Sequence, residues 1–213
     1  MAIKLNSFTL PDNVIRNMRD QLNKTIDKQE EYGLILCTEH DGNTIIDRQH
    51  CKGNECEIHI SRKCGTKEKF IGSYHTHPYN PAIMSAGDMI RTCKDNVNCI
   101  GGAGDNRIRC FVRKKTQNHL RLSESTSCSN KAKKYHEENE EHLSKRFEHI
   151  MKEYDHLDNL TYKAKKLNLD TEELDKIREK NDEKAIQYNK DVQDLRQKLT
   201  DLTDEYFDTI DIE

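Results

Sequence analysis

The first part of the chain combines one amphipathic helical stretch with several short apolar runs. From Val14 to Ile26, apolar residues recur every three or four positions, and Pro11 and Asp12 suit the start of a helix. The apolar runs that follow are short and are bounded by turn residues, so they predict strands. These runs lie at 32–37, 44–46, 57–60, 70–74, 99–101 and 107–112. Together the patterns predict a mixed α/β domain, with helices flanking a sheet of about six strands.

A different pattern begins after residue 130, because every glycine, proline and cysteine of the chain lies before that point. At 143–157 and again at 174–206, apolar residues step by three and four, which is the heptad spacing of a coiled coil. The interruption at 167–173 predicts a short turn between two helices. The sequence therefore predicts a C-terminal α-helical, antiparallel coiled-coil hairpin.

The two parts also differ in charge. There are 19 basic and 15 acidic residues before Lys131, against 16 basic and 23 acidic residues from there on. We therefore expect two domains, 1–128 and 129–213, the second with an acidic, frayed tail at 204–213. The basic excess of the first part is too small to indicate a nucleic-acid-binding face.

The composition bears on where the protein works. Charged residues make up 34% of the chain, hydrophobic residues 33%, and the mean hydropathy is −1.00. No run of about 18 apolar residues occurs, which predicts that the protein does not enter a membrane. The first residues lack the long apolar segment of a secretory signal, so we expect a cytoplasmic protein.

Two histidines and one aspartate have the spacing of metal ligands. His75 and His77 lie on a predicted strand, where alternate side chains share a face. Ser85 suits the N-cap of a helix beginning at Ala86, which places Asp88 in the first helical turn. Two imidazoles and one carboxylate leave zinc an open coordination position, which is typical of a catalytic ion. The sequence therefore predicts one catalytic Zn²⁺.

The order His-x-His-x7-Ser-x2-Asp at 75–88 resembles the metal signature of the JAMM (MPN+) metalloprotease family. That family also has an upstream glutamate, as Glu-x-x-Gly before an apolar strand. Glu30 matches it with Gly33, and Glu31 is the alternative register. The resemblance covers residues 1–115 and implies the mixed, cytidine-deaminase-like MPN fold for the first domain. It does not extend to the helical hairpin.

The resemblance implies a zinc-dependent isopeptidase of deubiquitinase type. Its substrate would be the amide bond after the C-terminal glycine of a ubiquitin-like protein, which we expect to be of prokaryotic type. His75, His77 and Asp88 would hold the zinc, and Glu30 would accept a proton from the attacking water. Ser85 would donate a hydrogen bond to the oxyanion or the water, besides capping its helix. The alternative is a non-catalytic scaffold that binds partners through its coiled coil.

The chain has eight cysteines, for which three interpretations stay open. Cys51, Cys56 and Cys64, with His50 and His59 beside them, are candidates for a second, structural zinc site, although their spacing is not that of a zinc knuckle. Cys93 and Cys99 bracket a helix end and are candidates for a disulfide. The default expectation for a cytoplasmic protein is that all are reduced thiols.

The helical hairpin has three candidate roles. It would pair two copies of the chain, dock a protein partner, or fold over the catalytic groove. The seam contains Asn181 and few β-branched residues, so it specifies no oligomeric state.

Overall fold

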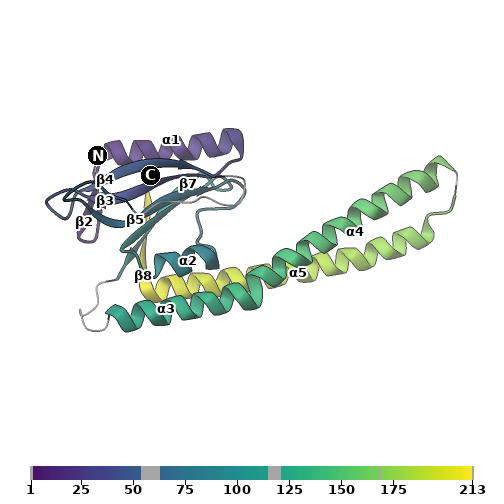
Figure 1. The fold of residues 1–213 in the computed structure, drawn as a ribbon. Coiled ribbons are helices and arrows are strands. Elements are labelled where there is room, and N and C mark those ends of the chain that lie inside the picture. The colour runs from purple at the N-terminus through teal and green to yellow at the C-terminus, as the bar shows by residue number, and fades with distance from the viewer. Residues whose placement is uncertain (1, 54–62, 115–120, 168, 213) are drawn as a thin grey trace. The chain divides into compact units, whose positions relative to one another are not determined.

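The computed structural model describes residues 2–53, 63–114, 121–167 and 169–212 (Figure 1). The chain divides into two compact units. Unit 1 comprises Met1–Asn130 and Leu202–Glu213, and unit 2 comprises Lys131–Asp201. In chain order the elements are β1 (Ile3–Leu5), β2 (Phe8–Leu10), α1 (Asp12–Lys28), β3 (Tyr32–Thr38), β4 (Ile45–Lys52), β5 (Lys69–His77), α2 (Ala86–Thr92), β6 (Val97–Gly102), β7 (Arg107–Arg113), α3 (Arg121–Tyr135), a π-helical turn (His136–Glu140), α4 (Glu141–Lys166), α5 (Glu172–Tyr206) and β8 (Phe207–Ile212).

A six-stranded mixed sheet forms the centre of unit 1. Its strand order is β4-β3-β5-β6-β7-β8, and β5 and β6 are parallel while the other neighbours are antiparallel. Helix α2 makes the crossover that two parallel strands require. Helix α1 covers one face of the sheet and α2 lies on the other (Figure 1). The predicted mixed α/β architecture is therefore confirmed.

The hydrophobic core of unit 1 lies between α1 and the sheet. The inward face of α1 contributes Val14, Met18 and Leu22, which are fully buried. Leu34 and Leu36 of β3 belong to the same core, and so does Tyr74 of β5. Side chains alternate along a strand, so residues 33, 35, 73, 75 and 77 face the α2 side. This alternation assigns the predicted histidine ligands to the face opposite the main core.

The helices of unit 2 form the predicted antiparallel hairpin. The residues of α4 that are buried most deeply recur every seven positions, at Leu143, Ile150, Leu157 and Ala164. Ion pairs link Arg146 to Asp191, and Glu153 to Lys184 with 2.8 Å between Nζ and Oε2. Seven residues forward on α4 correspond to seven residues back on α5, as antiparallel helices require. None of the described helices combines the length and apolar composition that crossing a membrane needs.

The end of the chain differs from the expected frayed tail. Residues 207–212 form β8, which pairs antiparallel with β7 at the edge of the sheet. Phe207 and Ile212 are buried, and the Asp211 carboxylate accepts from Arg109 Nε at 2.6 Å. The structure thus returns the chain to unit 1, whereas the expected second domain ran to residue 213. The acidic residues mask a period-two pattern, and only the distant partner β7 makes it a strand.

Other elements depart from the sequence-based expectation in smaller ways. The short hairpin of β1 and β2 was not predicted, because three-residue strands carry almost no periodic signal. The segment at 57–60, which we predicted as a strand, lies outside the described residues.

Six cysteines of unit 1 form disulfides. One disulfide joins neighbouring strands, since Cys99 and Cys110 lie directly opposite each other in the pairing of β6 with β7. Another joins Cys93, the residue that follows α2, to helix α3. The disulfides are Cys37–Cys64, Cys93–Cys128 and Cys99–Cys110.

These disulfides correct the sequence-based view of the cysteines. The expectation of reduced thiols is wrong, and Cys93 and Cys99 do not pair with each other. Cys64 is bonded to Cys37 and cannot ligate a structural zinc with Cys51 and Cys56. The spacing of the cysteines does not predict their pairing, because the fold sets which cysteines meet. Cys56 lies outside the described residues.

If β8 is part of the folded sheet, truncating its buried aromatic residue destabilises the protein. Phe207→Ala should lower the free energy of unfolding by about 3–5 kcal/mol, because the residue is only 2% exposed. The exposed residue Thr209 is the matched control, and Thr209→Ala should cost less than about 1 kcal/mol. Urea denaturation monitored by circular dichroism measures both, and equal stability of the two variants would contradict the strand assignment.

The disulfides predict a low thiol count. In the denatured, non-reduced protein, no more than two of the eight cysteines should react with a thiol reagent, since six are paired. Peptide mapping without reductant should recover the three linked pairs. Eight reactive thiols in protein purified without reductant would contradict the assignment.

Candidate metal centre

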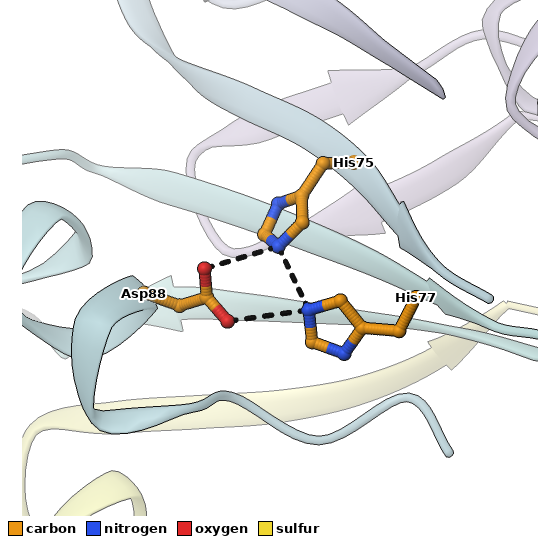
Figure 2. A group of neighbouring side chains, drawn as sticks. All are labelled: His75, His77 and Asp88. Carbon is orange, nitrogen blue, oxygen red and sulfur yellow. Dashed lines mark hydrogen bonds and ion pairs between the residues drawn. The ribbon is translucent and has the colours of Figure 1, made fainter. Parts of the chain in front are cut away.

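Three side chains of unit 1 point at a common position (Figure 2). The Nε2 atoms of His75 and His77 are 3.1 Å apart. Asp88 Oδ1 is 3.1 Å from His75 Nε2, and Asp88 Oδ2 is 3.3 Å from His77 Nε2. Within the part of the chain that the structure describes, this is the one group of three such side chains close enough to share a metal ion. The predicted ligand set is therefore brought together.

The two histidines are positioned by the strand that carries them. β5 runs between β3 and β6, and all but its first residues are largely buried. His75 pairs with Gly33 of β3 and with Ile100 of β6, and His77 pairs with Gly102 of β6. Strand pairing on both sides of His75, and with β6 at His77, fixes the direction of the two imidazoles, which lie on the α2 face.

The loop after His77 is attached to the turn between β6 and β7. The Ala103 amide donates to the His77 carbonyl at 3.0 Å, and the Ala82 amide donates to Asp105 Oδ1 at 3.1 Å. Gly102 permits this close approach, since a Cβ there would lie 2.1 Å from the Ala82 amide nitrogen. These contacts fold the loop back toward β5 and bring the start of α2 to the histidines.

A capping box fixes the first turn of α2. Ser85 Oγ accepts from the Asp88 amide at 3.1 Å, while the Ser85 amide and hydroxyl donate to Asp88 Oδ2 at 3.0 and 2.7 Å. The predicted N-cap role of Ser85 is confirmed. Because Ser85 holds Oδ2, the other carboxylate oxygen, Oδ1, is turned toward His75.

A chain of polar side chains ties the rest of α2 to the sheet. The Asp88 carbonyl accepts from Thr92 Oγ1 at 2.8 Å, and Thr92 Oγ1 accepts from Asn98 Nδ2 at 2.6 Å. Asn98 Oδ1 in turn accepts from Ser73 Oγ at 3.2 Å. The disulfide at Cys93 anchors the end of the helix. The sequence offered no signal for this chain, because its members come from three elements.

The ligand side chains are shielded from solvent and electrostatically coupled. His75 and His77 are 9% and 11% exposed at their side chains, and Asp88 is 16% exposed. Burial lowers the pKa of His77, but the hydrogen bond and charge of Asp88 and the charge of Glu31 outweigh it, so the pKa is raised. Burial would raise the pKa of Asp88, yet the two histidines hold that pKa well below its usual value. The carboxylate of Asp88 is thus ionised, as a metal ligand must be.

The donor set fits zinc. Two imidazole nitrogens and one carboxylate oxygen are common catalytic zinc ligands. At bond lengths of about 2.0–2.1 Å, neighbouring ligands of a tetrahedral zinc lie roughly 3.3–3.4 Å apart. His75 Nε2 lies 3.1 Å from His77 Nε2 and 3.1 Å from Asp88 Oδ1, and both separations are close to this value. Three protein ligands leave one position for water or substrate.

The structure does not bring Glu30 to the metal ligands. Its carboxylate pairs with Lys52 Nζ at 2.9 Å and accepts from the Tyr32 hydroxyl at 3.0 Å. The hydrogen bonds from Lys52 and Tyr32 lower the pKa of Glu30, which weakens it as a base. Glu30 is thus engaged in an ion pair and a hydrogen bond outside the metal ligand set.

Glu31, the alternative register, has different surroundings. The pairing of β3 with β5 begins at Gly33 and His75, and the alternation of side chains counted back from Gly33 predicts the α2 side for Glu31. Glu31 is 7% exposed, and its charge raises the pKa of His77. The two-residue period of a strand could have favoured Glu31 from the sequence alone. Of the two glutamates, only Glu31 has the parity of residues 33 and 35.

Comparison with known proteins adds no assignment. No family model matches the chain, and no curated protein matches it. The resemblance to the JAMM family accordingly stays a prediction that depends on the motif and the site geometry.

Removing either kind of ligand should empty the site. His75→Ala and Asp88→Asn should each reduce bound zinc from one ion per chain to a small fraction, because each removes one of only three protein ligands. Elemental analysis after dialysis measures the zinc, with His149→Ala of α4 as a control for an exposed histidine. Full zinc occupancy in both ligand variants would rule out this centre.

Proposed function

We propose that the protein is a zinc-dependent metallopeptidase that hydrolyses an amide bond. The observation that carries the proposal is the convergence of His75, His77 and Asp88 on one position, with the buried Glu31 close enough for its charge to act on His77. A buried metal site that has a carboxylate beside it, but outside the ligand set, supplies what amide hydrolysis needs: an electrophile and a proton acceptor.

The roles of the side chains follow from their positions. When bound, zinc would supply Lewis acidity, which favours ionisation of water and polarises a carbonyl. Glu31 accepts the proton of the attacking water and returns it to the leaving amine, so that the departing group is neutral. Ser85 holds Asp88 in its ligating orientation, and a further role as a hydrogen-bond donor to the oxyanion belongs to the proposal.

The motif resemblance narrows the substrate. We propose the amide that follows the C-terminal glycine of a ubiquitin-like protein of prokaryotic type, joined to a lysine or to a following peptide. The alternative, a non-catalytic scaffold, has no use for a complete ligand set or for a buried carboxylate beside it. The complete site therefore favours the enzyme.

The helical hairpin supports a role in binding proteins. Unit 2 exposes several large apolar side chains, among them Phe147, Met151, Ile177 and Ile186. Exposed apolar side chains on paired helices are typical of surfaces that contact another chain. We propose that the hairpin holds a protein partner or a second copy of the chain.

The disulfides bear on the compartment. Three disulfides within unit 1 are typical of proteins that work in an oxidising environment and are rare in a reducing cytosol. Proteins of hyperthermophiles are the known exception. We therefore favour an oxidising compartment or a disulfide-permissive cell over an ordinary reducing cytoplasm.

Glutamate-to-glutamine substitutions test the base. Glu31→Gln should keep zinc and fold but lower turnover at least about a hundredfold, since an amide cannot accept the proton. Glu30→Gln is the matched control and should be nearly silent, because that carboxylate is engaged by Lys52 and Tyr32. The measurement is single-turnover cleavage of a Gly-Gly peptide amide-linked to a fluorescent amine, with zinc quantified in the same samples.

The outcomes separate the register from the mechanism. An inactive Glu30→Gln beside an active Glu31→Gln would move the base back to Glu30 and keep the reaction. If both variants cleave at the wild-type rate with zinc bound, the proposed proton transfer is wrong. A wild-type protein that binds zinc but cleaves neither this peptide nor an isopeptide-linked conjugate would favour the scaffold.

A further inference from the structure

Between the two histidine ligands lies a residue whose side chain faces the other way. Thr76 is fully buried and directs its hydroxyl toward α1, because it alternates with His75 and His77 along β5. On that side it meets Thr25 of α1, which is also fully buried. The hydroxyl of Thr76 therefore contacts α1, while the side chains of its two neighbours face the metal position.

The hydroxyls form a directed chain of hydrogen bonds. The Tyr32 amide donates to Thr76 Oγ1 at 2.9 Å, and Thr25 Oγ1 donates to the Gln21 carbonyl at 3.1 Å. Since the proton of Thr25 is used in this way, the Thr76 hydroxyl donates to Thr25 Oγ1. The chain connects the first residue of β3 with β5 and α1, and every member is satisfied.

This chain begins where the backbone ladder ends. The pairing of β3 with β5 starts at Gly33 and His75, so Tyr32 has no backbone partner in β5. The Thr76 side chain takes over, accepting from the Tyr32 amide and lying 3.3 Å from the Tyr32 carbonyl. Glu31 directly precedes Tyr32 in the chain. Its carbonyl accepts from the amide of Gly53, the residue that follows β4, at 2.9 Å.

We infer that Thr76 is a positioning residue for Glu31. Its side chain holds Tyr32, the neighbour of the proposed base, and its backbone is part of β5, the strand that carries both histidines. The inference rests on the proposed function, and it adds that the distance between base and metal position is set by a side-chain hydroxyl. A displacement of about 1 Å in such a group is enough to slow a reaction by about a hundredfold.

Removing the hydroxyl at equal volume tests the inference. Thr76→Val should lower kcat roughly ten- to hundredfold with KM unchanged, and the zinc content should stay at the wild-type level, because the ladder still holds His75 and His77. Thr76→Ser restores the hydroxyl and should restore kcat. The assay is cleavage of the Gly-Gly peptide with the amide-linked fluorescent amine, using the full chain.

Thr25→Val is the matched control. It deletes a buried hydroxyl from the same chain, but the Tyr32 amide keeps its acceptor and the Thr76 proton turns to the Tyr32 carbonyl. Thr25→Val should therefore match Thr76→Val in its loss of thermal stability while keeping kcat. Equal loss of kcat in the two variants would show a general packing effect and overturn the positioning role.

A double variant shows whether Thr76 acts through Glu31. In a Glu31→Gln background, Thr76→Val should cause no further loss of kcat, because the group it positions is already inactive. A further tenfold loss, or loss of zinc in Thr76→Val, would overturn the inference. A wild type that cleaves no probe refutes the proposed function and the positioning role together, whereas an active wild type with a fully active Thr76→Val refutes the positioning role alone.

Discussion

The antiparallel pairing of β3 with β5 is the interaction on which the candidate site depends. It aligns Gly33 with His75, and from this register follows the face of the two histidines. A slip by one residue would turn the imidazoles toward α1 and Thr76 toward the metal position. Leu34 and Leu36 oppose such a slip, because they are fully buried in the core against α1. The hydrophobic core on one face of the sheet thus sets the chemistry on the other.

Asp88 is held by different means, since it comes from a helix and not from the sheet. The capping box with Ser85 orients its carboxylate locally. The hydrogen-bond chain through Thr92 and Asn98 and the disulfide at Cys93 fix the rest of α2. None of these contacts involves His75 or His77. Contacts within the protein therefore position α2, and with it Asp88, the third ligand.

Sequence reasoning succeeded where the determining interactions are local. His75 and His77 were predicted to share a face because two residues apart on any strand do so, and Ser85 with Asp88 forms a cap within one helical turn. It failed where the partner is distant. The strand character of Phe207–Ile212 depends on β7, and the disulfide partner of Cys93 lies 35 residues away. Heptad spacing was enough to predict the hairpin, since both of its helices repeat the same seven-residue pattern.

The two glutamates show the limit of motif spacing most clearly. A spacing counted from Gly33 selects Glu30, whereas strand parity from the same residue selects Glu31, and the choice depends on where β3 begins. The helix α1 ends at Lys28, and Gln29 adopts a left-handed conformation with φ of 56°. This turn leaves room for Glu30 to pair with Lys52 before the extended chain begins. The turn, which no spacing rule describes, sets where the extended chain of β3 begins.

The way the site is supported also bears on what a metal would do there. Structural zinc sites are closed by four protein ligands and supply the free energy of folding themselves. Here, within the described residues, three ligands converge, and each is already fixed by a ladder, a cap or a disulfide-anchored helix. A metal bound at this position is therefore not needed to assemble the fold. With three protein ligands, zinc held here would keep a coordination position for water or substrate, which is what chemistry at the metal would need.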